Sequence, residues 1–264
     1  MTRQQRLVFG EVAELYDRYR PAYPDAVVDD LIDLAALEQG TLVLEVGAGT
    51  GKATAMFAER GIRVLAVEPS AEMAGVARRM FGDRPAVQIE QSDFEQWDAA
   101  GREFPLLFAA QAWHWVEPAA GFAKAARVLL PGGVLAAFWN RPVWVRAELR
   151  DVVLDAYQRV APELLAETDP IHPAGVLPSD ADNWRRGVAG TSGLGDADVR
   201  DYEWSQRYSG GDYAALLETH STIRVLDPDQ RDALVAAVAD AIERHGNELV
   251  LPLVTRVCLA RRVK

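Results

Sequence analysis

A glycine-rich segment at residues 47–51 carries the clearest chemical signal in the sequence. It reads Gly-Ala-Gly-Thr-Gly, after a short apolar run at 42–46 and before a helical pattern that begins at Lys52. Alternating glycines let the backbone turn tightly and let a ligand approach without a Cβ in the way. Open α/β sheets bind nucleotides at such a strand–helix junction. The alternative is an ordinary tight turn, but three alternating glycines at this place favour a nucleotide-type ligand.

The residues that flank this segment distinguish between ligands. A dinucleotide loop has the pattern G-x-G-x-x-G, whereas here the third glycine comes one place early and Lys52 stands where close packing favours glycine. A P-loop is excluded because Ala53, not Ser or Thr, follows Lys52. Glu45, two residues before the segment, is a poor neighbour for a pyrophosphate and a good one for an ammonium group. The pattern therefore favours an amino-acid nucleoside over a dinucleotide.

Two further carboxylates follow predicted strands. Glu68 ends the second strand about 20 residues past the loop, where a carboxylate accepts hydrogen bonds from both ribose hydroxyls. Its alternative is a charge at a helix start ahead of Ser70. Asp93 follows the third strand and is a candidate acceptor for an adenine amino group, although Asp93 could simply begin a turn or cap a helix. Phe94 is a candidate to stack on adenine, with a core position as the alternative.

The elements that must position these residues alternate along the chain. Strands are predicted at 42–46, 63–67, 86–90, 104–110 and 134–139, and helices at about 52–60, 70–81 and 119–129. Such alternation predicts parallel βαβ units with right-handed crossovers, and therefore a doubly wound α/β sheet covered by helices on both faces. Further helices are predicted at 10–20, from Pro24 to an end at Gly40, and at 147–161, 212–224 and 228–244; strands are predicted at 199–208 and 248–260.

The chain is predicted to form a single domain over residues 1–264. Its parts are an N-terminal helical lid at 1–40, a cofactor-binding core at 41–140, a cap insertion at 141–197, and C-terminal strands and helices at 198–264. The insertion is interpreted as a cover over the sheet, because it is too short for a hydrophobic core of its own.

Composition narrows the class of partner. The formal net charge of −11 repels phosphate backbones, which are bound mainly through Lys and Arg, so no nucleic-acid partner is expected. Cys258 is the only cysteine, so an intramolecular disulfide is impossible and no metal site is expected. The sequence has no apolar run of membrane-spanning length and no signal-peptide pattern. A cytoplasmic protein, monomeric or homodimeric, is expected.

Several motifs together resemble the class I S-adenosylmethionine-dependent methyltransferases. They are residues 43–51, residues 67–70 with Met73, residues 92–94, and residues 131–135 at the turn into strand five. Residues 9–24 and 112–116 are similar to the small-molecule subgroup (methyltransferase type 11) that includes trans-aconitate methyltransferase-like proteins. The resemblance covers residues 9–140. It implies a Rossmann-like seven-stranded sheet, mostly parallel with an antiparallel final strand, and a helical cap between strands five and six.

The resemblance also implies residue roles toward S-adenosylmethionine. Glu45 and the glycine loop would hold the methionine portion, Glu68 the ribose, and Asp93 with Phe94 the adenine. Arg20 would pair with the cofactor carboxylate, with a surface helix charge as the alternative. The implied cofactor-binding residues are Tyr16, Arg20, Glu45, Gly47, Ala48, Gly49, Thr50, Gly51, Glu68, Pro69, Met73, Asp93, Phe94, Gln111 and Ala112.

Aromatic residues at the strand ends are the candidates for contact with a methyl acceptor. Methyl transfer from a sulfonium is an in-line displacement in which the protein mainly supplies positioning, and aromatic faces attract the sulfonium by cation–π interaction. Trp113, Trp115 and Trp139 are the predicted substrate-binding residues, under a roof formed by residues 141–197, for an apolar or aromatic small molecule. His114 is the candidate catalytic base. Its alternative is packing between two tryptophans, and His220 is a weaker candidate.

The predicted function is S-adenosylmethionine-dependent methyl transfer to a small molecule. Two other classes stay open. One is a protein that binds S-adenosylmethionine without methyl transfer, as a regulator or as an enzyme that uses the sulfonium only electrostatically, because loop residues report binding rather than turnover. The other is an NAD(P)-dependent oxidoreductase on a similar sheet, against which Glu45 and Lys52 argue.

Overall fold

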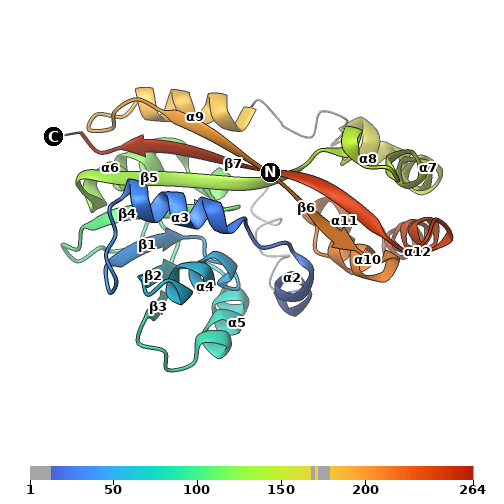
Figure 1. The fold of residues 1–264 in the computed structure, drawn as a ribbon, viewed down its shortest axis with the longest axis horizontal. Helices are drawn as coiled ribbons and strands as arrows, with labels where there is room; N and C mark the ends of the chain where they lie inside the picture. The colour runs from blue at the N-terminus through green and yellow to red at the C-terminus, as the bar shows by residue number, and fades with distance from the viewer. Residues whose placement is uncertain (1–12, 168–169, 172–178, 264) are drawn as a thin grey trace. The chain divides into compact units, whose positions relative to one another are not determined.

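The computed structural model describes residues 13–167, 170–171 and 179–263, and the chain divides into two compact units (Figure 1). The sheet unit comprises Ala22–Asn140, Pro178–Tyr202 and Thr255–Lys264. The helical unit comprises Met1–Pro21, Arg141–Leu177 and Glu203–Val254. Phe9, where the sequence resemblance begins, lies outside the described residues.

A seven-stranded sheet has the order β3-β2-β1-β4-β5-β7-β6, mostly parallel with one antiparallel strand. Its strands are β1 (Leu42–Val46), β2 (Arg63–Val67), β3 (Val87–Glu90), β4 (Phe104–Ala110), β5 (Leu129–Pro142), β6 (Asp198–Tyr208) and β7 (Leu249–Arg261). Strand β1 is parallel to both neighbours, since Leu44 pairs with Leu65 of β2 and with Leu107 of β4. This Rossmann-like arrangement confirms the predicted fold class.

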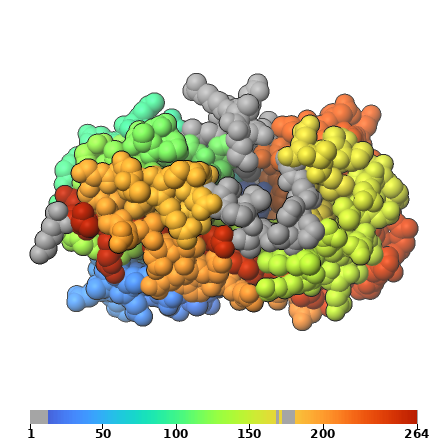
Figure 2. Space-filling model, turned by 90° about the horizontal axis from the view of Figure 1, so that it is seen from above, coloured from blue at the N-terminus to red at the C-terminus, as the bar shows by residue number. Residues whose placement is uncertain are grey.

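Helices cover both faces of the sheet because side chains alternate along each strand. The helices of the sheet unit are α3 (Asp25–Leu34), α4 (Lys52–Glu59), α5 (Ala71–Phe81), α6 (Pro118–Val128) and α9 (Ser179–Ala189). One hydrophobic cluster joins Phe108 of β4 to Phe57 of α4, and another joins Leu107 to Phe122 of α6 and Trp184 of α9. In Figure 2 the gold surface of α9 lies beside the green surface that includes α6.

The helical unit has a hydrophobic cluster of its own. Its elements are α2 (Ala13–Tyr19), the 3-10 turn η2 (Trp144–Arg146), α7 (Arg150–Val160), α8 (Pro162–Glu167), α10 (Gly210–Glu218), α11 (Ser221–Arg224) and α12 (Pro228–Arg244). Buried Val153 and Tyr157 of α7 share the cluster with Leu234 and Val238 of α12. Part of the predicted cap insertion therefore shares a core with residues from later in the chain. The assignment of residues 1–264 to one domain stays a prediction.

Several predicted elements differ in the structure. Helix α3 ends at Leu34 rather than at Gly40. Helix α6 ends at Val128 and strand β5 starts at once, so Pro131–Gly133 lies inside the strand rather than before it. Gly132 has φ 80°, and the register of pairing between β4 and β5 shifts between Phe104 and Leu106. Residues Pro131–Gly133 therefore form an irregularity within β5, like a bulge. The helix predicted at 212–224 is two helices, and α8 and α9 lie where no helix is predicted.

The break between α10 and α11 has a tertiary cause. The hydroxyl of Thr219 donates to the carbonyl of Leu216, and Arg20 donates from Nη2 to the Thr219 carbonyl at 3.0 Å. The Ile223 amide then donates to His220 rather than to Thr219. An arginine almost 200 residues away in the chain thus takes the carbonyl that a continuous helix would use.

Two features are absent from the described part of the chain. Within that part of the chain, no helix is both long enough and apolar enough to cross a membrane. The same residues contain no group of three or more His, Cys, Asp or Glu side chains arranged to hold a metal ion.

Candidate functional site

The glycine loop lies where the sequence predicts it, between the end of β1 at Val46 and the start of α4 at Lys52. Gly47, Gly49 and Gly51 have φ values of 70°, 60° and 94°, in the left-handed region that favours glycine. The Gly47 amide donates to the carbonyl of Val67 at 2.8 Å, which ties the loop to the end of β2.

The three glycines serve different purposes. A Cβ on Gly47 would lie 2.4 Å from the Cβ of Ala112, and one on Gly51 would lie 2.5 Å from the Phe81 ring. A Cβ on Gly49 would meet no heavy atom of the described structure within 4 Å. Gly47 and Gly51 therefore allow the loop to pack against protein, whereas Gly49 presents open space to which a ligand has access.

Glu68 is buried at the carboxyl end of β2 and is held by two backbone amides. Its Oε2 accepts from the Gly49 amide at 2.7 Å, and its Oε1 accepts from the Ser70 amide at 2.8 Å. These two amides hold both carboxylate oxygens in one orientation at the end of β2. The geometry fits the predicted ribose contact and also fixes the orientation of the loop.

Glu45 is a fully buried carboxyl in β1. Its Oε2 accepts a short hydrogen bond from the hydroxyl of Thr54, while Oε1 has no hydrogen-bond partner among the described residues. Burial raises the pKa of Glu45 to about 8; the Thr54 hydrogen bond acts in the opposite direction, and the charge of Glu68 adds to the rise. An unpartnered carboxyl oxygen in such a place is costly, and a cationic group bound beside it would favour the charged form.

Residues at the end of β4 meet the glycine loop. Gln111 has φ 56°, an unusual value for a residue with a side chain, and its amide donates to Phe138 at 2.8 Å. The next residue, Ala112, is buried and occupies the space that a side chain at Gly47 would need. The structure therefore brings these two predicted residues to the loop, and a strained backbone at such a place is a feature of functional sites.

The residues predicted around adenine are divided between surface and core. Ser70 caps α5 by accepting from the Met73 amide at 3.2 Å, so Pro69 and Met73 follow the strand as predicted. The Asp93 carbonyl accepts from the amides of Gln96 and Trp97, which matches the alternative that this residue begins a turn.

Phe94 is only 3% exposed. Its ring packs against Trp97 and Trp113, with centroid separations of 6.4 and 6.1 Å. The core position that the sequence left open for Phe94 is therefore present in the structure.

The aromatic segment after β4 forms a 3-10 turn, η1 (Trp113–Trp115). Trp113 is buried, and its ring centroid lies 5.2 Å from that of Phe122 and 5.9 Å from that of Trp184. Trp113 is thus a core residue, whereas His114 is exposed and Trp115 is half-buried. The His114 and Trp115 rings lie 4.9 Å apart.

A hydrogen bond between Trp139 and His114 defines the state of the imidazole. The indole Nε1 of buried Trp139 donates to Nδ1 of His114 at 3.1 Å. An indole nitrogen is only a donor, so Nδ1 accepts and the neutral imidazole carries its hydrogen on Nε2. For this imidazole to take a proton, Nδ1 would have to give up the Trp139 bond. The geometry favours His114 as a hydrogen-bond donor over His114 as a general base.

Tyr16 and Arg20 belong to the helical unit. Arg20 donates from Nε to the Thr219 hydroxyl at 2.7 Å, and its guanidinium lies 5.2 Å from the centroid of the Tyr16 ring. Their predicted cofactor contacts stay a prediction. Burial, with the charge of Arg20 added, holds the pKa of His220 well below its usual value of 6.5, so this imidazole is neutral at physiological pH.

Sequence reasoning missed Thr54, whose hydroxyl is the partner of Glu45. Thr54 is buried in the first turn of α4, on the side that faces β1. A polar residue at a core-facing helical position, close to a buried acid in the preceding strand, is the signal that could have identified it.

Residues 44–137 match the family model of the methyltransferase domain. Over 155 residues the chain is 39% identical to an uncharacterized methyltransferase of Mycobacterium tuberculosis, a match covering 57% of this chain and 60% of that protein. An uncharacterized methyltransferase of a Geobacillus species is 30% identical over 153 residues, covering 53% of this chain and 71% of that protein. The chain belongs to the methyltransferase family.

Solved structures share the fold of this methyltransferase. A protein of Anaeromyxobacter dehalogenans, proposed to be a type II methyltransferase, has a TM-score of 0.63 at 24% identity and covers 92% of this chain and 98% of its own. A phosphoethanolamine N-methyltransferase of Haemonchus contortus, bound to S-adenosylhomocysteine, has a TM-score of 0.55 at 15% identity, covering 97% and 58%. At these identities the likeness concerns the fold.

Proposed function

We propose that this methyltransferase transfers the methyl group of S-adenosylmethionine to a small molecule. The observation that carries the proposal is the glycine loop, in which Gly47 and Gly51 are packed against protein and Gly49 faces open space. The loop is tied to Glu68 and follows directly after the buried Glu45. A backbone cradle between two carboxylates fits a ligand that has hydroxyls at one end and an ammonium group at the other.

The residues present fit that cofactor. Glu68, oriented by the amides of Gly49 and Ser70, would accept the ribose hydroxyls. The unpartnered Oε1 of Glu45 would face the ammonium group of the methionine portion. The loop residues Gly47, Ala48, Gly49, Thr50 and Gly51 would lie along that portion, with Gln111 and Ala112 beside them.

When bound, the cofactor supplies a methyl group that is already activated by a sulfonium charge. The protein then has to orient the acceptor and exclude water, and positioning alone contributes roughly 7–11 kcal/mol in favourable systems. Exposed His114, held by the Trp139 indole, would donate a hydrogen bond from Nε2 to the acceptor, and the half-buried Trp115 would contact its apolar part. Trp113 would act indirectly, by fixing the turn that carries both residues.

The charge of the chain supports a small acceptor. A formal net charge of −11 opposes the phosphate contacts that dominate binding of DNA and RNA. An acceptor without a polyanionic backbone carries no such penalty.

The proposal is tested with purified protein and cofactor labelled in its methyl group. S-adenosylhomocysteine is expected to raise the melting temperature, whereas NAD and NADP are expected to leave it unchanged. Label is then expected in a low-molecular-weight product from a panel of hydroxyl, amine, thiol and carboxylate acceptors. Stabilisation by NAD rather than by S-adenosylhomocysteine would contradict the cofactor assignment. Tight cofactor binding with no transfer over a broad panel would favour the non-methylating alternative.

A further inference from the structure

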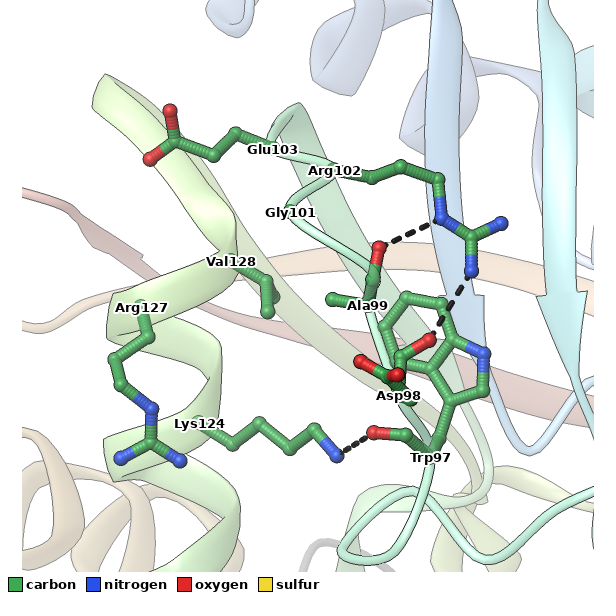
Figure 3. Close-up of a pocket in the computed structure, with 9 residues that line it drawn as sticks. All are labelled: Trp97, Asp98, Ala99, Gly101, Arg102, Glu103, Lys124, Arg127 and Val128. Carbon is green, nitrogen blue, oxygen red and sulfur yellow. Dashed lines mark hydrogen bonds between the residues drawn. The ribbon is translucent and has the colours of Figure 1, made fainter.

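A cavity lies at the end of the sheet opposite the glycine loop. Its volume is about 440 Å³, and it lies between the segment at Trp97–Glu103, which precedes β4, and the last turns of α6 (Figure 3). Strands β1, β2, β4 and β5 are parallel, so the amino end of β4 is at the opposite edge from the carboxyl end of β1. The cavity is therefore distinct from the candidate cofactor site, and its volume is in the range of small-molecule sites.

The lining of this cavity differs in charge from the rest of the chain. It contains three cationic and two acidic side chains, in a protein whose formal net charge is −11. One of the cationic side chains and one of the acidic side chains form ion pairs with residues outside the lining. Arg102 bonds Glu90 at 2.8 Å, and Glu103 bonds Arg262 at 2.7 Å. Lys124, Arg127 and Asp98 remain, with an excess of one positive charge.

Lys124 is a buried lysine, with only 9% of its surface exposed. Its Nζ donates to the backbone carbonyl of Trp97, as drawn in Figure 3, and to the backbone carbonyl of Glu95. An ammonium group has three donors, so one donor remains after these two bonds. The Nζ atom also lies 5.3 Å from the centroid of the Phe94 ring and 5.6 Å from that of the Trp97 ring. Burial lowers the pKa of Lys124; the neighbouring charge of Arg127 lowers it further, whereas the charges of Asp98 and Glu95 act in the opposite direction.

Arg127 follows three residues later on α6, and three-residue spacing places both cations on one side of the helix. Within residues 13–167, 170–171 and 179–263, Arg127 forms no ion pair. An anion bound between the two cations would offset their repulsion and would use donors that the protein leaves available.

The wall between the charged groups is apolar. Val128 of α6 faces Ala99 across the cavity, as Figure 3 shows. An inorganic ion would leave this wall without contact, because the cavity is much larger than one ion. The lining therefore fits a ligand that combines an anionic group with a short apolar part.

We propose that this cavity binds a small organic anion. Lys124 and Arg127 bind the carboxylate or phosphate group, and Ala99 and Val128 contact the apolar part. The site is independent of the proposed methyl transfer, since it lies at the opposite end of the sheet and shares no residue with the glycine loop.

Isothermal titration calorimetry of the full chain tests this assignment, with hexanoate, hexanamide and inorganic phosphate as probes. Hexanoate is expected to bind one to one and at least tenfold more tightly than the neutral hexanamide. Inorganic phosphate is expected to bind more weakly than hexanoate, because it makes no contact with the apolar wall. Equal affinities for hexanoate and hexanamide would overturn the anion assignment, and phosphate binding as tight as that of hexanoate would overturn the role of Ala99 and Val128.

Two variants distinguish binding at this cavity from a general effect of the protein's charge. Arg127 is exposed, so Arg127→Ala is expected to fold normally and to weaken hexanoate binding about tenfold. Arg159→Ala removes the same charge from an exposed position in the helical unit and is expected to leave hexanoate affinity unchanged. Equal losses in the two variants would overturn the proposal. So would loss of hexanoate binding on saturation with S-adenosylhomocysteine, an outcome that would leave the proposed methyl transfer intact.

Discussion

The glycine loop at 47–51 and the aromatic turn at 113–115 follow neighbouring parallel strands, yet they use their residues in opposite ways. In the loop, Gly49 faces open space, whereas a side chain at Gly47 or Gly51 would collide with protein. In the turn, the large side chain of Trp113 is inserted into the core, and only His114 is exposed. Glycine spacing therefore reported a local backbone requirement correctly, whereas aromatic spacing did not reveal which ring is available to a ligand.

The largest effect that tests this contrast is expected from Trp113→Ala. Removing a buried aromatic side chain that packs on Phe122 and Trp184 should lower the free energy of unfolding by about 3–5 kcal/mol. Urea denaturation followed by circular dichroism measures this change. The matched variant Trp115→Ala, at a half-buried position, is expected to cost less than about 1 kcal/mol. Comparable losses in the two variants would contradict the assignment of Trp113 to the core.

Glycine substitutions test the glycine loop in the same way. Gly49→Ala and Gly40→Ala introduce a methyl group at φ values of 60° and 81°, and neither meets a heavy atom of the described residues within 4 Å. Each should therefore lower stability by about 1–2 kcal/mol through backbone strain. Only Gly49→Ala should weaken S-adenosylhomocysteine binding, by tenfold or more, as measured by calorimetry. Gly47→Ala should cost more stability than either, because its Cβ collides with Ala112.

An equal loss of S-adenosylhomocysteine affinity in Gly40→Ala and Gly49→Ala would show that the open face of Gly49 does not contact the cofactor.

Glu45 makes the stability of the loop region dependent on pH. The pKa of Glu45 is raised from 4.5 to about 8 in the folded protein, so the folded state retains a proton that the unfolded chain releases. Its contribution to stability is present below about pH 4.5 and is lost as pH rises from there to about 8. The variant Glu45→Gln removes this titration, so the free energy of unfolding should fall less steeply between pH 5 and about pH 8 than in the parent.

Denaturation midpoints measured at several pH values compare Glu45→Gln with its parent. Parallel pH profiles for the two proteins would argue against a buried neutral carboxyl at this position.

The smallest effect is expected at the hydrogen bond between Trp139 and His114. Trp139→Phe keeps the ring in the core and removes the donor to Nδ1, at a cost of about 1 kcal/mol in stability. Nitrogen-15 spectra of the imidazole should then show that hydrogen is no longer confined to Nε2. If the parent protein showed hydrogen on Nδ1, the donor role of His114 would be wrong.

The sequence predicted much of the sheet unit because its signals are local. Strands β1, β2 and β4 fall within the predicted ranges, and the turn at Gly47–Gly51 requires backbone angles that only glycine adopts readily. Glu45 and Glu68 were identified by their place relative to that turn, since the ends of parallel strands meet at one edge of a sheet. Thr54 was missed, because its role depends on a contact between helix and strand rather than on a motif.

Other features were decided only by tertiary structure. Helix α9 has a weakly helical sequence, and it forms where Trp184 packs against Trp113 and Phe122 and donates to the Leu259 carbonyl at 3.1 Å. Arg20 ends a helix at Thr219 by taking its carbonyl, and buried residues of α7 and α8 share a core with those of α10 and α12.

By itself, then, the sequence determined the glycine loop, its flanking acids and the alternation of strands and helices in the sheet core. These features depend on residues that are close together in the chain. The tertiary structure decided which aromatic rings are buried, where long helices break and which segments share a core. These outcomes depend on contacts between residues that are distant in the chain, and no local pattern specifies them.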